Sequence, residues 1–237
     1  MGSRVPLILA ALAIVLSFLT PTAAKAQCEQ SATFTGSSGQ LLQDIGKERS
    51  SNLGLAVMPA FSCPAFDDWT VWGDVWNRFD ASGLRLNETD LEGSITKSWG
   101  PVSLELYAAY FDLPPQPFRQ GVVELYAGIG YSFDFGWIKV KPAIRPIHMI
   151  GVGGLADLTL LRARTKVEVP NFMHPAVTLA LEPSVTYNFT RQPGLPEVAF
   201  RPEIALHYDF SDQVRLSLAG KAANRHKIIE GGMTIKF

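Results

Sequence analysis

The stretch "VELYAGIGYSF" (residues 123–133) decides the fold class of this chain, because large apolar and polar or small side chains alternate along it. Val123, Leu125 and Ile129 share one parity, and the positions between them include glutamate, tyrosine and glycine. A period of two residues is typical of a β-strand with one apolar and one polar face. Segments of roughly ten residues with this pattern recur between turn-like stretches from Trp69 to Phe237.

Four of these other segments are clear, at residues 89–99, 102–110, 138–146 and 177–189. Aromatic residues gather at the expected strand ends: Trp99, Tyr110, Phe133, Trp137, Tyr187, Phe189, Tyr208 and Phe237. An apolar belt between two aromatic girdles is typical of strands that cross a bilayer. The sequence therefore predicts an all-β fold, an antiparallel up-and-down transmembrane β-barrel. The alternative is a soluble β protein that buries the same apolar faces.

The strand count has two readings. Ten strands are predicted between Trp69 and Phe237, with short turns at one end and longer loops at the other. Within the less regular residues before them, "QSATFTG" (30–36) and "NLGLAVMPAF" (52–61) can add a hairpin, which makes twelve strands. Because bacterial barrels have an even strand number, ten and twelve both stay open and eleven is disfavoured.

Two local features bear on this count. The stretch "QLLQDIGKERSS" (40–51) between the two extra segments is polar and is expected to be a loop. Four prolines fall inside predicted strands, where each removes a ladder hydrogen bond: Pro142, Pro146, Pro183 and Pro202. We expect β-bulges at these prolines.

The first 26 residues have the features of a secretory signal peptide. Arg4 precedes an uncharged apolar run from Val5 to Leu19, and Ala24-Lys25-Ala26 is a small-x-small cleavage pattern. A run of about 15 residues is short for a membrane-spanning helix. The chain is thus predicted to have three parts: a signal peptide (1–26), an N-terminal segment with a possible extra hairpin (27–67) and an outer-membrane β-barrel (68–237).

Removal of the signal peptide would leave 237 − 26 = 211 residues with a net charge of 19 − 22 = −3. This acidic balance argues against a nucleic-acid partner, which calls for a basic excess. Cys28 and Cys63 both lie in the exported part, where an even pair of cysteines favours one structural disulfide. Since no CxxC motif or histidine cluster accompanies them, no metal site and no cofactor is expected.

The last residues, "EGGMTIKF" (230–237), form one more amphipathic strand. Met233, Ile235 and Phe237 resemble the C-terminal targeting strand of Gram-negative outer-membrane proteins, which ends in an aromatic residue. The resemblance implies that these residues form an assembly signal read by the barrel-assembly machinery. It also implies a location in the cell outer membrane, with lipid against the apolar face.

A second resemblance runs through "WTVWGDVWNRFD" (69–80), "TDLEGSITKSWGPVSLELYAAYFDLP" (89–114) and "VELYAGIGYSFDFGWIKVKP" (123–142). This order is similar to that of TorF-type porins: a Trp-Gly strand, an acidic strand, a Gly-Pro turn, an aromatic strand and a Glu-Leu-Tyr strand. The resemblance implies an outer-membrane channel. The chain departs from that pattern before residue 69, which leaves the strand number open.

Charged side chains on the polar faces form a candidate lumen charge patch. Acidic residues fall on three consecutive predicted strands and basic residues on the next two: Asp90, Glu92, Glu105, Glu124, then Lys139, Lys141, Arg145, Arg162, Arg164 and Lys166. A charge on the lipid face would cost roughly 2–4 kcal/mol at the bilayer midplane, so these residues are expected to face the lumen. The patch predicts a narrow porin-like channel for small polar solutes. The alternative is a closed structural or adhesion-type barrel whose lumen is filled by salt bridges.

An outer-membrane hydrolase is the third possibility, since such enzymes pair a nucleophile with a histidine at the outer rim. The candidate histidines are His148, His174, His207 and His226. His174 falls in a predicted periplasmic turn, His207 points inward near that end, and His148 has lipid-facing parity. No catalytic residues are therefore assigned, and the protein is not expected to be an enzyme.

Overall fold

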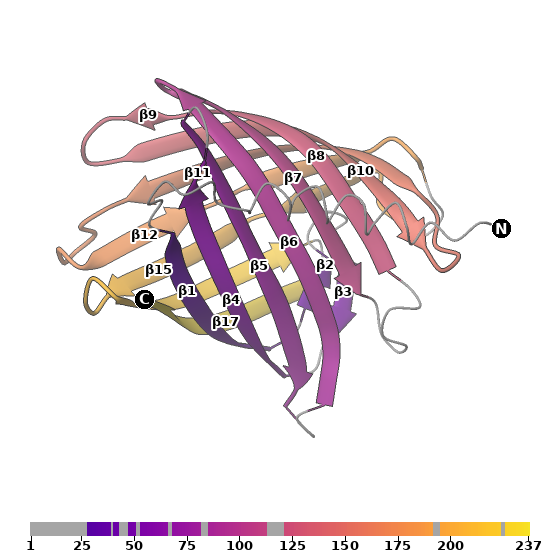
Figure 1. Ribbon diagram of the computed structural model, residues 1–237, viewed down its shortest axis with the longest axis horizontal. Helices are drawn as coiled ribbons and strands as arrows, with labels where there is room; N and C mark the ends of the chain where they lie inside the picture. Colours follow the sequence, from indigo (N-terminus) through magenta and orange to yellow (C-terminus); the bar gives the residue numbers. More distant parts are fainter. Residues whose placement is uncertain are drawn as a thin grey trace.

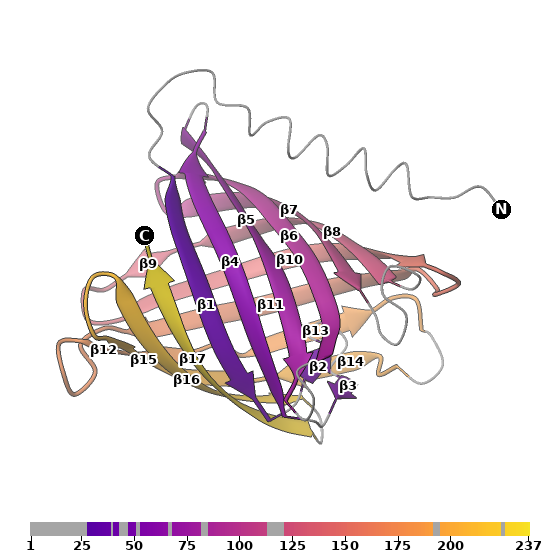
Figure 2. The same ribbon diagram turned by 60° about the horizontal axis from the view of Figure 1, so that its bottom comes forward.

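The structure is a computed structural model that describes residues 28–38, 40–42, 47–50, 53–65, 68–81, 85–112, 121–191, 195–223 and 226–237. The predicted signal peptide lies outside these residues. Antiparallel strands, inclined to one another, curl into a closed barrel (Figures 1 and 2). The described part of the chain has no helix long and apolar enough to cross a membrane, which has no bearing on crossing by strands.

Twelve long strands form the barrel wall when pieces that share one register are joined. In order around the wall these are β1 (Glu29–Ser37), β4 (Gly54–Pro64), β5 (Trp69–Asp80), β6 (Arg85–Trp99), β7 (Val102–Asp112), β8 (Gly121–Tyr131), β10 (Lys139–Val152), β11 (Leu158–Val169), β12 with β13 (Val177–Leu181 and Ser184–Asn188), β15 with β14 (Glu203–Asp209 and Val198–Arg201), β16 (Val214–Ala223) and β17 (His226–Lys236). The short β9 (Phe133–Asp134) continues β8 along β10.

Closure of the wall depends on β1. It pairs with β4 on one side and with β17, the last strand, on the other. The barrel therefore has twelve strands, the larger of the two predicted counts, and it begins ahead of residue 68. The preferred count of ten omitted the hairpin of β1 and β4. The stretch expected to be a loop between them contains a small hairpin of its own, β2 (Gln40–Leu42) and β3 (Lys47–Ser50).

The expectation of bulges at the four prolines is wrong. The pairing of β10 with β11 keeps one register past Pro142 and Pro146. Pro183 and Pro202 interrupt two strands, but the same register holds on both sides, so they lie opposite each other. Their carbonyls still accept bonds, from Thr165 N–H and Ala222 N–H respectively, both at 3.1 Å. Each of these two prolines forfeits only its own donor, which the wall tolerates without a shift.

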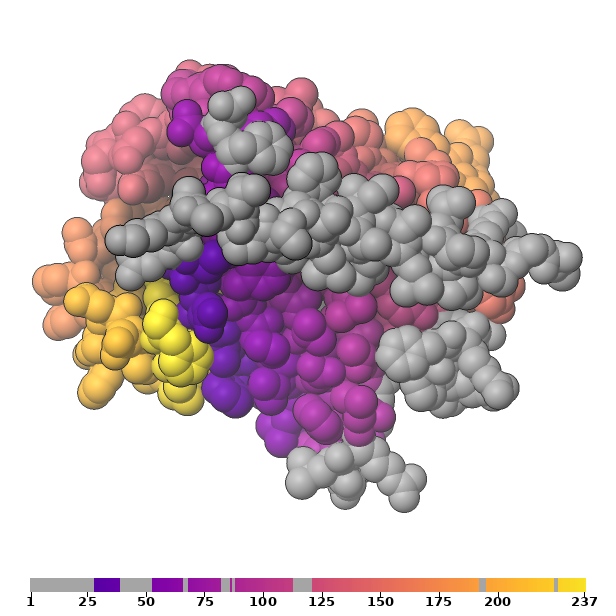
Figure 3. All heavy atoms as spheres, viewed as in Figure 1, coloured from indigo at the N-terminus to yellow at the C-terminus, as the bar shows by residue number. Residues whose placement is uncertain are grey.

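The two faces of the wall differ as the alternation predicts. On β8, Leu125, Ala127 and Ile129 are exposed on the outside, whereas Glu124 and Tyr126 are buried on the inside. Exposed large apolar side chains of this kind occur on nearly every long strand. On the side shown in Figure 3, β4, β5 and β6 pack as a continuous wall where grey atoms do not cover them. An apolar outer surface with paired strands throughout is what a bilayer requires.

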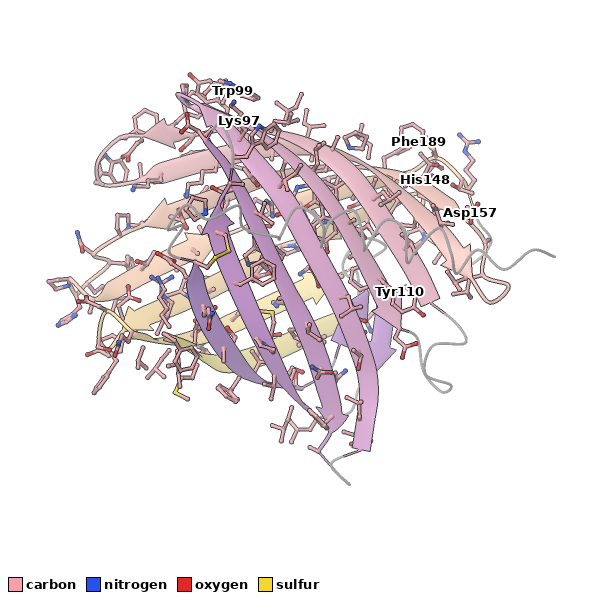
Figure 4. The ribbon with its side chains drawn as sticks, viewed as in Figure 1. Lys97, Trp99, Tyr110, His148, Asp157 and Phe189 are labelled. Atoms are coloured by element: carbon pink, nitrogen blue, oxygen red, sulfur yellow. A yellow bond between two sulfur atoms is a disulfide. The ribbon has the colours of Figure 1, made fainter. Side chains whose placement is uncertain are left out.

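One end of the barrel carries the short turns at residues 100–101, 135–138, 170–176 and 210–213 and also holds Cys28 and Phe237; we call it the short-turn end. There Trp69 and Trp99 meet edge to face at 6.4 Å between ring centroids. Lys97 has outward parity on β6, and its Nζ lies 5.8 Å and 5.6 Å from the two rings (Figure 4). A lysine on the outer face is thus held at an aromatic girdle, where its amine can reach the interface.

Cys28 and Cys63 form a disulfide, as predicted. Cys63 lies on β4 and Cys28 directly precedes β1, next to the pair Glu29 and Ser62, with 4.3 Å between the two Cα atoms. The bond therefore ties the start of the first wall strand to its neighbour at the short-turn end. This anchors an edge that would otherwise be a frayed terminus.

We expect a non-reduced digest of the purified barrel to yield one cross-linked peptide that contains Cys28 and Cys63. The register already places the two residues opposite each other, so a double Cys→Ser variant should keep the twelve-strand wall and lose only the cross-link. Mass spectrometry before and after reduction measures this. Two alkylated thiols in the native protein would contradict it.

Candidate functional site

The inner faces of β10 and β11 form a ladder that runs from the short-turn end toward the long loops. Its directly opposed pairs, in that order, are Lys139 and Glu168, Lys141 and Lys166, Ala143 and Arg164, Arg145 and Arg162, Ile147 and Leu160, and Met149 and Leu158. The first four pairs carry charge and the last two are apolar. Exposure falls along the same direction: Lys141 keeps 43 % of its side-chain surface, whereas Arg145 keeps 9 %. The lumen is therefore open and charged near the short turns and closed further in.

All ten residues of the predicted charge patch lie on strands with inward parity, on β6, β7, β8, β10 and β11. The structure adds inward charges that the sequence analysis did not assign: Asp74, Arg78, Glu88, Glu168, Glu182, Arg201, Glu203, Lys221 and Glu230. The same parity rule, applied to residues 69–80 and 198–230, would have found most of them. The acidic part and the basic part of the charge patch thus both extend further around the barrel than predicted.

Several ion pairs join charged side chains on the basic side of the lumen. Glu168 forms ion pairs with two lysines: its carboxylate oxygens lie 2.7 Å from Lys141 Nζ and 2.8 Å from Lys166 Nζ. Three more pairs join neighbouring positions: Arg164 with Glu182 at 3.1 Å, Arg201 with Glu203 at 3.3 Å and Lys221 with Glu230 at 3.1 Å. Part of the charge is therefore neutralised within the wall, as the salt-bridged alternative expects.

One pair crosses the boundary between the acidic and basic strands. Arg145 on β10 donates from Nη2 to Glu105 on β7 at 2.6 Å. Between them on β8, Gly128 leaves room for the arginine, since a Cβ there would lie 3.1 Å from Arg145 Cγ. The guanidinium also lies 4.5 Å from the ring centroid of Tyr126. A cation held by a carboxylate and an aromatic face is fixed in orientation.

A stacked pair of tyrosines continues this arrangement. Tyr126 stacks on Tyr107 with 4.4 Å between ring centroids. The Tyr107 hydroxyl donates to Glu92 Oε2 at 2.6 Å. One aromatic stack thereby brings together Glu92, Glu105 and Arg145, which come from three strands. Glu124, on the fourth strand, has the same inward parity as Tyr126 and lies two positions before it.

Beyond Arg145 and Arg162 the inner faces of β10 and β11 are apolar, which the sequence analysis missed. Tyr126, Ile147, Leu158 and Leu160 form a buried cluster, in which Leu160 has 0 % and Ile147 has 1 % exposure. Tyr107, Met149 and Leu195 pack against it. Leu195 comes from the connection between β13 and β14, so a loop residue helps to fill the barrel. We call this group the apolar constriction.

The charges enclose a cavity just short of the apolar constriction. It measures about 250 Å³ and is lined by eight residues from β10 to β16: Arg145, Arg162, Arg164, Glu182, Ser184, Arg201, Glu203 and Lys221. A second cavity, of about 290 Å³, lies toward the short-turn end and shares Arg145 and Arg164 with the first. Its other lining residues include Lys141, Lys166 and the Gly100–Pro101 turn. Together the two cavities extend from the Gly100–Pro101 turn to Arg145 and Arg162, next to the apolar constriction.

His148, His174 and His207 do not line either of these two cavities. His148 Nδ1 lies 3.2 Å from Thr159 Oγ1 on the outer face, and His148 appears with Asp157 and Phe189 at the long-loop end in Figure 4. His207 Nδ1 lies 2.8 Å from Ser217 Oγ, but near the short-turn end. The adjacent carboxylate of Asp209 is bonded to Arg215 at 2.6 Å and 3.0 Å, so it does not orient that imidazole as a catalytic triad would. His174 accepts a bond from Ala176 N–H within a turn.

The described ranges contain no group of three or more histidine, cysteine, aspartate or glutamate side chains placed to hold a metal ion.

The sequence matches no family model and no curated protein. Solved structures with a similar fold include the KdgM porin in complex with disordered oligogalacturonate, at a TM-score of 0.56 and 10 % identity over 88 % of this chain and 99 % of that one. An outer membrane channel from Pseudomonas putida F1 aligns at 0.55 and 11 % identity, over 92 % of this chain and 99 % of that one. The translocator domain of autotransporter NalP from Neisseria meningitidis aligns at 0.54 and 10 % identity, over 99 % and 95 %. At such identities the likeness shows the barrel fold alone.

Proposed function

We propose that this protein is an outer-membrane β-barrel that acts as a narrow porin-like channel for small polar solutes. The observation that carries the proposal is the cavity lined by Arg145, Arg162, Arg164, Arg201 and their neighbours inside a closed twelve-strand wall. Charged rings inside a pore select solutes by charge and polarity. Several barrels of similar fold are porins or channels, which supports the same reading. No enzymatic step is part of the proposal.

The proposed location is the outer membrane, reached after export with a cleaved signal peptide. The apolar outer face and the girdle around Lys97 support a partnership with membrane lipid. The TorF-type resemblance agrees with a channel and stays a prediction. The barrel-assembly machinery is the proposed partner during insertion, through Met233, Ile235 and Phe237.

A closed structural or adhesion-type barrel is the second candidate, because two observations favour it. The ion pairs fill part of the lumen, and the apolar constriction narrows it beyond Arg145. Hydrophobic constrictions can also act as gates that open by wetting. Conductance of the refolded protein in planar bilayers separates the two candidates: discrete channel events support the channel, and a silent bilayer with verified folded protein supports the closed barrel.

Reversing two charges tests which solutes the lumen favours. In a conducting barrel, Arg162→Glu with Arg164→Glu should shift ion selectivity toward cations, because both side chains line the cavity. The reversal potential in a salt gradient measures this. Arg191→Glu is the control, since Arg191 lies in a connection with 73 % of its side chain exposed. A stable double variant with unaltered selectivity would mean that these arginines lie off the conduction path.

The last residue offers a test of assembly. Phe237 N–H donates to Gln30 O at 2.9 Å, so its backbone helps to close the barrel seam, whereas the residue as a whole is 76 % exposed. Phe237→Ser keeps that backbone bond and removes only the aromatic ring of the proposed assembly signal. We therefore expect normal export but less folded barrel in the outer membrane. Heat-modifiable gel mobility of membrane fractions at native expression measures the folded amount. Unchanged levels would show that the terminal ring is not read during assembly.

A further inference from the structure

The cavity between β10 and β16 has more positive than negative charge. Its lining has five cations and two carboxylates, 5 − 2 = +3. Two more carboxylates, Glu105 and Glu230, hold Arg145 and Lys221 from outside the lining, and with them the count is 5 − 4 = +1. An enclosed site of this composition attracts anions, because its charge is poorly screened by water.

The register of β10 with β11 concentrates part of this positive charge at one level of the lumen. Arg145 and Arg162 are directly opposed on β10 and β11, and opposed like charges destabilise a strand pair. The pair Lys141 and Lys166, two rungs nearer the short turns, has the same problem. There Glu168 bonds both amines, at 2.7 Å and 2.8 Å.

The carboxylate that bonds Arg145 comes from further around the wall. That carboxylate, Glu105, stands on β7, two wall strands from Arg145 and three from Arg162. Arg145 and Arg162 both line the cavity, so an anion held there meets two guanidinium groups at once.

We propose that this cavity binds a small dicarboxylate, with one carboxylate near Arg145 and Arg162 and the other toward Arg201 and Lys221. Planar guanidinium groups match the geometry of carboxylates and bind them through paired hydrogen bonds. The volume of about 250 Å³ equals that of about eight water molecules at ~30 Å³ each, which suits a short-chain ligand. Lys141 and Lys166 in the second cavity line its approach from the short-turn end.

The cavity is also bounded on its far side. Ile147 and Leu160 form the next rung after Arg145 and Arg162, and both are buried. An anion that enters from the short-turn end therefore meets the basic pair directly before an apolar barrier. In this arrangement the ligand is held at the last basic rung of β10 and β11. The inference deepens the proposed channel function, and its meaning for transport rests on that function; binding itself does not require conductance.

Isothermal titration of succinate into the folded barrel in detergent tests the proposal. Succinamide, which has the same skeleton without charge, is the control ligand. We expect saturable binding of one succinate per barrel, weaker at high salt, and none of succinamide. Arg162→Gln should weaken succinate binding about tenfold or more, because it removes a charged donor. Arg191→Gln, in an exposed connection, should leave it unchanged.

Folding of each variant is checked by heat-modifiable gel mobility. If Arg162→Gln does not fold, the comparison of succinate with succinamide on the wild type still decides the proposal. Absent succinate binding, equal binding of both ligands, or full affinity in folded Arg162→Gln would each overturn it. A barrel that conducts but does not bind succinate contradicts this inference alone, whereas one that binds succinate and never conducts contradicts only the channel.

Discussion

Replacing Glu105 by glutamine is expected to lower the free energy of unfolding of the barrel by about 3 kcal/mol, at the lower end of the cost of breaking a buried ion pair. Glu105 bonds Arg145 at 2.6 Å, and the arginine side chain is only 9 % exposed. The variant leaves that cation largely buried without its carboxylate. We choose the lower end because Glu105 itself keeps 26 % of its side-chain surface.

The chain supplies a matched control. Arg215 and Asp209 form a pair with the same 2.6 Å distance, but their side chains are 47 % and 41 % exposed at the short-turn end. Asp209→Asn should therefore cost no more than about 1 kcal/mol, because water screens and replaces the lost interaction. The two substitutions change the same chemical group and differ in burial.

Urea titrations of refolded protein in detergent, followed by tryptophan fluorescence and gel mobility, measure both values. Equal losses in the two variants would show that burial of Arg145 does not control the energetics of the lumen. A stabilised Glu105→Gln barrel would show that the pair costs more in desolvation than it returns.

Leu160→Ser is expected to raise single-channel conductance several-fold in a conducting barrel. Leu160 is fully buried inside the barrel and is opposed by Ile147 within the apolar constriction. A shorter, polar side chain removes both volume and the barrier to wetting at that level. The lost packing should also cost stability, by about 2–5 kcal/mol as in other large-to-small core changes, so conductance is recorded only from protein with native gel mobility.

The adjacent Leu161 provides the control, because successive residues of a strand point to opposite faces. Leu161 is 37 % exposed on the outer face. Leu161→Ser should leave conductance unchanged. Planar-bilayer recordings of both variants at one salt concentration make the comparison. A wild-type conductance in folded Leu160→Ser would place the narrowest point of the pathway elsewhere.

Local pattern was sufficient for much of the fold. Alternation along residues 123–133 assigns Glu124 and Tyr126 to the inside, and the structure has them there. The same rule works for the arginines and lysines of β10 and β11. It works because a strand in a barrel has only two faces, so a single parity choice orients every side chain along it.

The apolar constriction escaped prediction for a physical reason. Ile147 and Leu160 have the same inward parity as Arg145 and Arg162. The sequence alone does not distinguish an apolar residue packed inside the barrel from an apolar residue on the same parity near the rim. Their burial depends on contacts with Tyr126 from another strand and Leu195 from a connection. Such contacts join residues far apart in the chain and are absent from any local window.

What the sequence by itself determined, therefore, is the strand character, the inward face of the ten charged side chains in the predicted patch and the disulfide between Cys28 and Cys63. Only the tertiary structure decided that the wall closes with twelve strands, because closure requires β1 to pair with β17 across the whole length of the chain. It also decided which charges meet. Glu105 reaches Arg145 across β8 because the wall curves and Gly128 leaves space between them, and neither curvature nor space is encoded in the period of a single strand.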